Sequence, residues 1–314
     1  MGSLYIDRKD IEIKVEGNSL VFYCQGNREG SAPLQPLERV VIIGNVRIET
    51  LVLHRLALNN IAVIFLSGRR LAFRGILHGR LHNNGLLRVK QYEKSLSFFT
   101  LIFSRELMEA KLKKQIEFLA ELKDLRPEFK SEISSSIQSM EFICNQLKEA
   151  DSPDSIRGLE GSAANCYFKA LTLVFPPSLN FAGRRRRPPV DPVNALLSLT
   201  YTLLHFELVR EIELIGLDPV IGFYHSFEYG RESLACDLVE AFRADADRFV
   251  FNLFREREFK EDDFTRSESG GQDGCFLKKK SREKYFRHYE EWAREKRPLW
   301  RSYVQNLARR LLNG

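Results

Sequence analysis

Three short segments in the second half of the chain each place an acidic side chain or an imidazole among apolar residues. Glu160 lies in a Gly-Leu-Glu-Gly segment, His225 ends a Gly-Phe-Tyr-His segment, and Asp237 and Glu240 bound an Asp-Leu-Val-Glu segment. A buried charge is costly unless an opposite charge compensates it. A divalent cation is the simplest partner for two or three acids and one histidine, so the pattern indicates a metal site.

Each signal also has an ordinary structural explanation. An Asp-x-x-Glu pair on a helix is more often a charged surface stripe, and Arg243 could form an ion pair with Glu240. A single histidine in an apolar connector is more often a hydrogen-bonded core residue, and Glu160 could complement a helix dipole. Taken together, the segments favour a metal, and carboxylates with one imidazole suit Mg²⁺ or Mn²⁺.

Basic residues are concentrated in an arginine run and in the C-terminal tail. From Lys278 onward, twelve Lys and Arg face four Glu, whereas the net charge of the whole chain is +6. Arginine suits phosphate oxygens, and four consecutive guanidinium groups cannot all pair internally. The alternatives are a solvated surface or attraction to an anionic membrane. We predict that DNA backbone is bound by these residues: Arg184, Arg185, Arg186, Arg187, Arg243, Lys278, Lys279 and Lys280.

Composition limits the class of protein. The 314 residues suffice for one large domain or two ordinary ones. The chain has no apolar run of the ~20 residues that cross a bilayer and no signal-peptide pattern at its start, so we expect a cytoplasmic protein without membrane attachment. Five scattered cysteines without a Cys-x-x-Cys pair argue against a zinc ribbon or a disulfide scaffold.

The periodicity of apolar residues changes from about Glu93, and we predict an α+β fold with two domains, 1–85 and 86–314. Residues 1–85 show the two-residue alternation of strands around one short helix at 49–59. Residues 86–314 show helical spacing, with starts at Ser152-Pro153-Asp154, where Asp154 is the expected N-cap, and at Asp191-Pro192. We expect 262–276 to form a turn and Pro298 to separate two basic helices.

The order of these motifs resembles one family, the CRISPR-associated endonuclease and integrase that inserts new spacers together with a small partner protein. Its Gly-x-Glu-Gly helix corresponds to Gly158–Ala164, and its arginine-rich segment before Asp-Pro-Val-Asn to Arg184–Leu197. Its Gly-Leu-Asp-Pro and Gly-Phe-x-His motifs correspond to Gly216–His225, and its Asp-Leu-x-Glu helix to Ser233–Arg243. The resemblance extends from end to end of the chain.

The resemblance implies a function and a set of partners. Glu160, His225 and Glu240 would hold Mg²⁺ or Mn²⁺, with Asp237 as a neighbouring acid of unassigned catalytic role. The enzyme would act on double-stranded DNA, namely a short prespacer duplex and the repeat. It would form a homodimer through a β-rich domain at 1–85, catalyse through 86–314, and be joined in pairs of dimers by a small CRISPR-associated partner.

Two further points stay open at this stage. A non-catalytic DNA-binding or scaffold protein of the same complex is the alternative function, in which the acids form simple ion pairs. The apolar strands between Arg39 and Leu66 fit either a dimer interface or a core. Tyr201 and His205, one turn apart on the helix after the arginines, could touch DNA, but we expect core packing.

Overall fold

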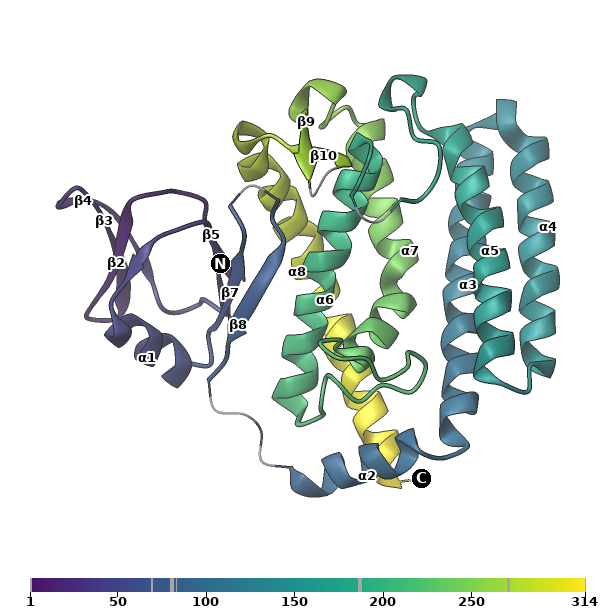
Figure 1. Ribbon diagram of the computed structural model, residues 1–314, viewed down its shortest axis with the longest axis horizontal. Helices are drawn as coiled ribbons and strands as arrows, with labels where there is room; N and C mark the ends of the chain where they lie inside the picture. The colour runs from purple at the N-terminus through teal and green to yellow at the C-terminus, as the bar shows by residue number, and fades with distance from the viewer. Residues whose placement is uncertain are drawn as a thin grey trace. The chain divides into compact units, whose positions relative to one another are not determined.

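The computed structural model describes residues 2–68, 70–79, 82, 84–185, 188–269 and 272–313, apart from the side chains of 267–269, 272 and 273. Compact packing divides the chain into two units. The first contains Met1–Asn83 and Phe286–Pro298, and the second contains Asn84–Tyr285 and Leu299–Gly314. Figure 1 shows strands early in the chain and mostly helices later, which confirms the expected α+β fold.

The first unit contains two small sheets. One has the order β4-β3-β2-β6, built from β2 (Ile11–Glu16), β3 (Ser19–Cys24), β4 (Asn27–Pro33) and β6 (Arg47–Ile48). Gly17 has a positive φ of 59° in the tight turn that joins β2 to β3, which glycine adopts without steric cost. The antiparallel register then places Ile13 opposite Phe22.

The second sheet of this unit has the order β1-β5-β7-β8. Its strands are β1 (Ser3–Ile6), β5 (Arg39–Ile43), β7 (Ala62–Leu66) and β8 (Phe73–Leu77). Strands β5 and β7 are parallel, and the connection between them includes α1 (Thr50–Leu58). All five residues of β5 are buried in the single chain. Core packing therefore accounts for these apolar runs, which is one of the two explanations left open by the sequence.

The second unit is built mainly from helices (Figure 1). Helix α3 packs against α4, α5 and α7, and α6 packs against α7. The helix bounds are α2 Gly85–Ser95, α3 Phe99–Leu125, α4 Lys130–Gln146, α5 Pro153–Val174, α6 Pro192–Ile215 and α7 Ser233–Arg255. Short 3-10 turns follow α3, α4 and α5 at Pro127–Phe129, Leu147–Glu149 and Pro177–Leu179, and a fourth spans Glu261–Asp263.

Capping residues fix where the helices of the site begin and end. Ser152, not Asp154, is the N-cap of α5, because its side chain accepts a hydrogen bond from the Ser155 amide and Pro153 occupies the first turn. Asp191 caps α6 in the same way, accepting from the Asn194 amide, as expected. Gly216 ends α6 with a φ of 97°, a conformation that favours glycine.

Two expectations about the end of the chain are wrong. The segment 262–276 contains a hairpin of β9 (Phe264–Ser269) and β10 (Gln272–Leu277), anchored by a hydrogen bond from the Cys275 amide to the Pro189 carbonyl. Pro298 lies inside one helix, α8 (Lys279–Asn313). Fully buried aromatic side chains occur on both sides of that proline, at Tyr289 and Trp300, and their packing sustains the helix through it.

Among the described residues, the helices include none with the length and apolar character that a membrane span requires.

Candidate active site

Two of the predicted acids meet at a lysine that the sequence prediction did not include. Lys111 lies on α3, which packs against α5 carrying Glu160 and α7 carrying Glu240. Its Nζ atom lies 2.5 Å from Glu160 Oε1 and 2.7 Å from Glu240 Oε2. Lys111 is 3% exposed and Glu240 is 2% exposed. The fold therefore brings both glutamates around one buried ammonium group.

Arg243 supplies a second positive charge, one turn along α7 from Glu240. Its Nη2 atom donates a hydrogen bond to Glu240 Oε1 at 2.5 Å. Burial opposes the charge on Glu240, but Arg243 and Lys111 outweigh it and lower the pKa of Glu240 to about 2. Burial also opposes the charge on Glu160, and Lys111 outweighs it there and lowers that pKa too. Both carboxylates are thus ionised at neutral pH.

The connector between α6 and α7 brings the predicted histidine to the same cluster. Tyr224 donates its hydroxyl to Glu160 Oε2 at 2.6 Å. Burial, followed by the charge of Glu160, raises the pKa of Tyr224, so the phenol stays protonated as a donor. The next residue, His225, lies within electrostatic range of Glu240.

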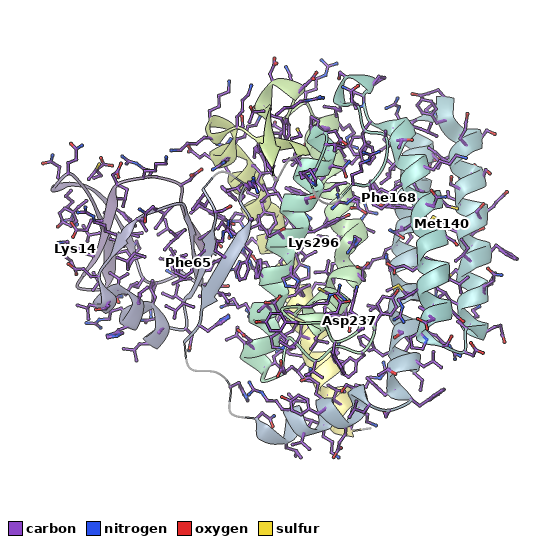
Figure 2. The ribbon with its side chains drawn as sticks, viewed as in Figure 1. Lys14, Phe65, Met140, Phe168, Asp237 and Lys296 are labelled. Atoms are coloured by element: carbon purple, nitrogen blue, oxygen red, sulfur yellow. The ribbon has the colours of Figure 1, made fainter. Side chains whose placement is uncertain are left out.

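Asp237, labelled in Figure 2, holds the connector against α7. Its Oδ2 atom accepts from the amides of Phe223 and Tyr224 at 2.6 and 3.0 Å. Its Oδ1 atom lies 2.8 Å from the His225 amide nitrogen and 2.7 Å from His225 Nδ1. A carboxylate at Nδ1 favours the tautomer with the proton on Nδ1, which leaves the Nε2 lone pair available. Asp237 therefore orients His225.

The donor types fit a divalent metal, although no group of three or more His, Cys, Asp or Glu side chains is arranged to hold one in the part of the chain that the structure describes. Glu240 Oε2 is paired with the Lys111 ammonium, whose Nζ atom lies 2.7 Å away. Ionised carboxylates and a neutral imidazole nitrogen are suitable ligands for Mn²⁺. The assignment of Glu160, His225 and Glu240 as ligands stays a prediction.

A buried layer of hydroxyl and carboxyl groups continues from this cluster along α7. Asp247 accepts hydrogen bonds from the hydroxyls of Tyr167, at 2.8 Å, and Tyr201. The guanidinium groups of Arg184 and Arg243 both lie over the ring of Tyr201, 5.3 and 4.7 Å from its centroid. Burial raises the pKa of Asp247 to about 6, against the opposing effect of the hydroxyl hydrogen bonds.

Tyr201 therefore packs in the core, as expected. His205, one turn further along α6, lies with its Nε2 atom 3.2 Å from Glu232 Oε2 and not in the Asp247 layer.

The residues predicted to bind DNA have different surroundings. Arg184 is held by Asn194 and Ser198, at 2.9 and 3.1 Å, so it is part of the packed structure. Arg185 is exposed, whereas Arg186 and Arg187 lie outside the described residues. Lys278 donates to the Asp262 carbonyl, and Lys279 and Lys280 are exposed at the start of α8. Arg243 is buried beside Glu240.

Lys111, Tyr224 and Asp247 belong to the cluster but are absent from the sequence prediction. A signal existed for Lys111, because it interrupts the buried stripe of α3 formed by Leu107, Met108 and Leu112. A lysine in such a stripe requires a charged partner from another helix. The partner could not be named, because helix pairing is set by packing between distant segments.

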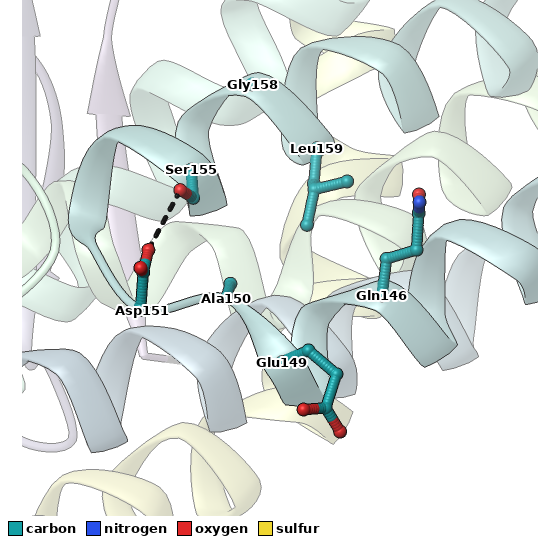
Figure 3. A pocket seen from close by; sticks show the side chains of 7 residues that line it. All are labelled: Gln146, Glu149, Ala150, Asp151, Ser155, Gly158 and Leu159. Atoms are coloured by element: carbon teal, nitrogen blue, oxygen red, sulfur yellow. Dashed lines mark hydrogen bonds between the residues drawn. The ribbon is translucent and has the colours of Figure 1, made fainter.

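An open hollow of about 630 Å³ lies at the end of α4 and the start of α5. Figure 3 shows its lining, where Ser155 bonds to Asp151. The lining residues are Gln146, Glu149, Ala150, Asp151, Ser155, Gly158 and Leu159. Its lining includes Gly158 and Leu159, which precede Glu160 in the sequence, but none of the side chains of the Lys111 cluster.

Comparison with known proteins defines the class. The family model described as CRISPR associated protein Cas1 matches residues 4–291. A protein from Thermodesulfovibrio yellowstonii, named CRISPR-associated endonuclease Cas1 1, is 52% identical over 313 residues, covering 99% of this chain and 98% of that protein. A second relative, from Rhodospirillum rubrum and named CRISPR-associated endonuclease Cas1 2, is 32% identical over 86% of this chain and 80% of its own length.

Solved structures show the same fold. A Cas1 protein from Thermotoga maritima superposes with a TM-score of 0.85 at 24% identity, covering 100% of this chain and 97% of that one. A chain of a Cas6-RT-Cas1–Cas2 complex gives 0.83 at 24% identity, over 99% of this chain and 35% of that one. The chain belongs to the CRISPR-associated Cas1 family, which confirms the resemblance drawn from its motifs.

Proposed function

We propose that the protein is a metal-dependent DNA endonuclease and integrase that inserts short foreign DNA as new spacers into a CRISPR array. Its membership of the Cas1 family and its close relative named an endonuclease support this function. The observation that carries it is the pair of ionised, largely buried carboxylates on α5 and α7, with the connector holding His225 beside them.

In the proposed integration reaction, the 3′-hydroxyl oxygen of a short duplex attacks a phosphorus atom at the edge of a repeat. A new P–O bond forms, the existing bond from that phosphorus to the 3′-oxygen of the preceding nucleotide breaks, and that oxygen leaves with a proton as a hydroxyl. Water attacks instead in the cleavage reaction. A divalent metal, when bound, would lower the pKa of the attacking oxygen and stabilise charge on the phosphate.

The residues of the chain have distinct roles in this proposal. Glu160, Glu240 and His225 Nε2 would hold the metal, while Asp237 keeps His225 in the required tautomer. Arg243 lies next to Glu240 and would favour the extra negative charge of the transition state. The exposed side chains of Arg185, Lys279 and Lys280 would contact DNA backbone, in double-stranded prespacer and repeat DNA.

The proposed assembly follows that of the family. The chain would form a homodimer through the β-rich domain at 1–85, with catalysis in 86–314, and a small CRISPR-associated protein would bridge two dimers. The likeness in fold to a chain of a Cas6-RT-Cas1–Cas2 complex is compatible with such a partner.

One observation favours the alternative of a non-catalytic DNA-binding scaffold. Lys111 and Arg243 already neutralise Glu160 and Glu240, as simple structural ion pairs would. The two functions differ in their requirement for metal, since a scaffold would bind DNA equally well with or without it.

The test is strand transfer of a short labelled duplex into a supercoiled target, with Mn²⁺ or with EDTA. We expect activity only with Mn²⁺, and a loss of at least about 100-fold in Glu160→Gln, because the variant lacks one anionic ligand. Glu121→Gln is the matched control, since Glu121 pairs with Arg248 outside the cluster. Equal activity in EDTA, or in Glu160→Gln, would contradict the proposal.

A further inference from the structure

Lys111 stands apart from the other charged residues of α3 because its whole side chain is buried. Its side chain is 4% exposed, whereas that of Lys113, two residues away, is 61% exposed and pairs with Glu109 on the same helix. Burying an ammonium group has a large desolvation cost that only close anions offset. Glu160 and Glu240, which come from two other helices, therefore offset the cost of burying the Lys111 ammonium.

The reverse dependence also holds, because the two carboxylates repel each other. Each raises the energy of the other's ionised form, and burial adds to that cost. A positive charge between them offsets both effects. With Nζ at 2.5 and 2.7 Å from one oxygen of each, Lys111 is the group that links α5 to α7 through these acids.

A metal ion held by the same carboxylates would lie close to the Lys111 ammonium. A protonated lysine carries three donors and no lone pair, so it cannot act as a ligand beside the metal. Two cations within a few ångströms in a buried site repel strongly, since screening by water is weak there. The flexible four-carbon stem of lysine allows the ammonium to leave without movement of the helix.

We propose that Lys111 is an internal cation that holds Glu160 and Glu240 together in the metal-free protein and competes with a divalent metal for them. This inference rests on the proposed metal-dependent function and adds a residue that regulates occupancy of the site. Metal binding then requires displacement of the ammonium, so the affinity of the site is lower than its ligands alone would give.

The experiment measures Mn²⁺ binding by electron paramagnetic resonance and the melting temperature with and without Mn²⁺. We expect Lys111→Met to bind Mn²⁺ roughly tenfold more tightly than the unmodified chain, the scale on which neighbouring groups change metal affinity. Without metal its melting temperature should fall by several degrees, and Mn²⁺ should restore it, because binding stabilises the folded state.

The matched control is Lys114→Met. Lys114 is on the same helix and also pairs with α7, through Asp245 and the Ala241 carbonyl, but it does not touch the two glutamates. This variant should lose some stability and keep the Mn²⁺ affinity of the unmodified chain. An equal gain of Mn²⁺ affinity in Lys114→Met would overturn the inference, because the loss of any positive charge near the site would then explain the effect.

The remaining outcomes distinguish a failure of the role of Lys111 from a failure of the proposed metal-dependent function. Equal or weaker Mn²⁺ binding by Lys111→Met, with normal binding by the unmodified chain, would overturn the role of Lys111 alone. Absence of binding by both would overturn the metal-dependent function as well. Lys111→Met could fail to fold without metal. Recovery of the folded state on refolding with Mn²⁺ would then support the inference, and failure to recover it would overturn the inference. The Mn²⁺ affinity is in that case measured again with Lys111→Gln, which keeps a polar group.

Discussion

At the scale of single residues, the site is a balance of buried charges. Glu160 and Glu240 are neutralised by Lys111 and Arg243, while Asp237 gives its four hydrogen-bond contacts to the connector and His225. The sequence motifs identified the acids and the histidine, because each lies in an apolar segment. They could not identify Lys111, because its role depends on two helices that are distant in sequence.

Asp247 gives a pH dependence that can be measured. Its pKa rises from 3.8 to about 6 in the folded chain, because burial disfavours the carboxylate. The unfolded chain therefore loses this proton at lower pH than the folded chain, and stability from this group is present below about pH 4 and lost as the pH rises through 6. Asp247→Asn cannot ionise and should lack this loss.

The free energy of unfolding in urea, measured for both chains between pH 4 and 7, checks this expectation. Between pH 4 and 7 the unmodified chain should lose up to about 3 kcal/mol of unfolding free energy relative to Asp247→Asn. Curves that stay parallel from pH 4 to 7 would show that Asp247 keeps an ordinary pKa.

At the scale of elements, α7 is the scaffold of the site. It carries Asp237, Glu240, Arg243 and Asp247 at intervals of three or four residues, so all lie along one side of the helix. The connector before it is pressed against its first turn. Gly222 makes this approach possible, because a Cβ atom there would lie 2.7 Å from Asp237 Oδ2 and from the Ser233 carbonyl carbon.

Gly222→Ala tests that contact. We expect a loss of about 1–3 kcal/mol in stability, since backbone and a buried carboxylate must both shift, together with weaker Mn²⁺ binding as His225 is displaced. Gly161→Ala is the control, because nothing lies within 4 Å of the added methyl and alanine favours the interior of α5 by up to about 1 kcal/mol. The free energy of unfolding in urea is measured for both variants. Similar changes in Gly222→Ala and Gly161→Ala would show that the close approach at Gly222 is unimportant.

Sequence patterns predicted the elements well where local chemistry decides them. Asp191 and Gly216 mark the ends of α6 as expected, because caps and left-handed positions have strong residue preferences. The hairpin of β9 and β10 was missed, since a Ser- and Gly-rich segment has weak strand propensity and its pairing with the Pro189 carbonyl is a distant contact. Local propensity predicts a break at Pro298, whereas α8 continues through it, because the packing of Trp300 on distant residues does not show in local propensity.

At the scale of the whole molecule, α8 contributes to both units. Its segment Phe286–Pro298 belongs to the first unit, where Phe286 stacks on Tyr5 with ring centroids 4.4 Å apart. The following segment belongs to the second unit, where Trp300 lies edge-on to Phe242. One helix thus supplies core residues to two cores.

A pair of alanine variants should separate these contributions. Phe286→Ala should speed amide hydrogen exchange mainly in β1 and β5, and Trp300→Ala mainly in α7, each at a cost of about 3–5 kcal/mol to the core it lines. Hydrogen exchange followed by mass spectrometry gives the pattern by segment. Acceleration of both regions to the same extent by either variant would mean that the two units unfold as one.

The path of α8 also has a consequence for synthesis on the ribosome. Most of the first unit lies before residue 84, yet part of it, Phe286–Pro298, follows α7 in the sequence. The nascent chain therefore cannot complete that unit until α2 to α7 have emerged, because Phe286, whose ring stacks on Tyr5, is synthesised after them. The first unit is thus begun before the helices α2 to α7 of the second unit are synthesised and is completed only after them.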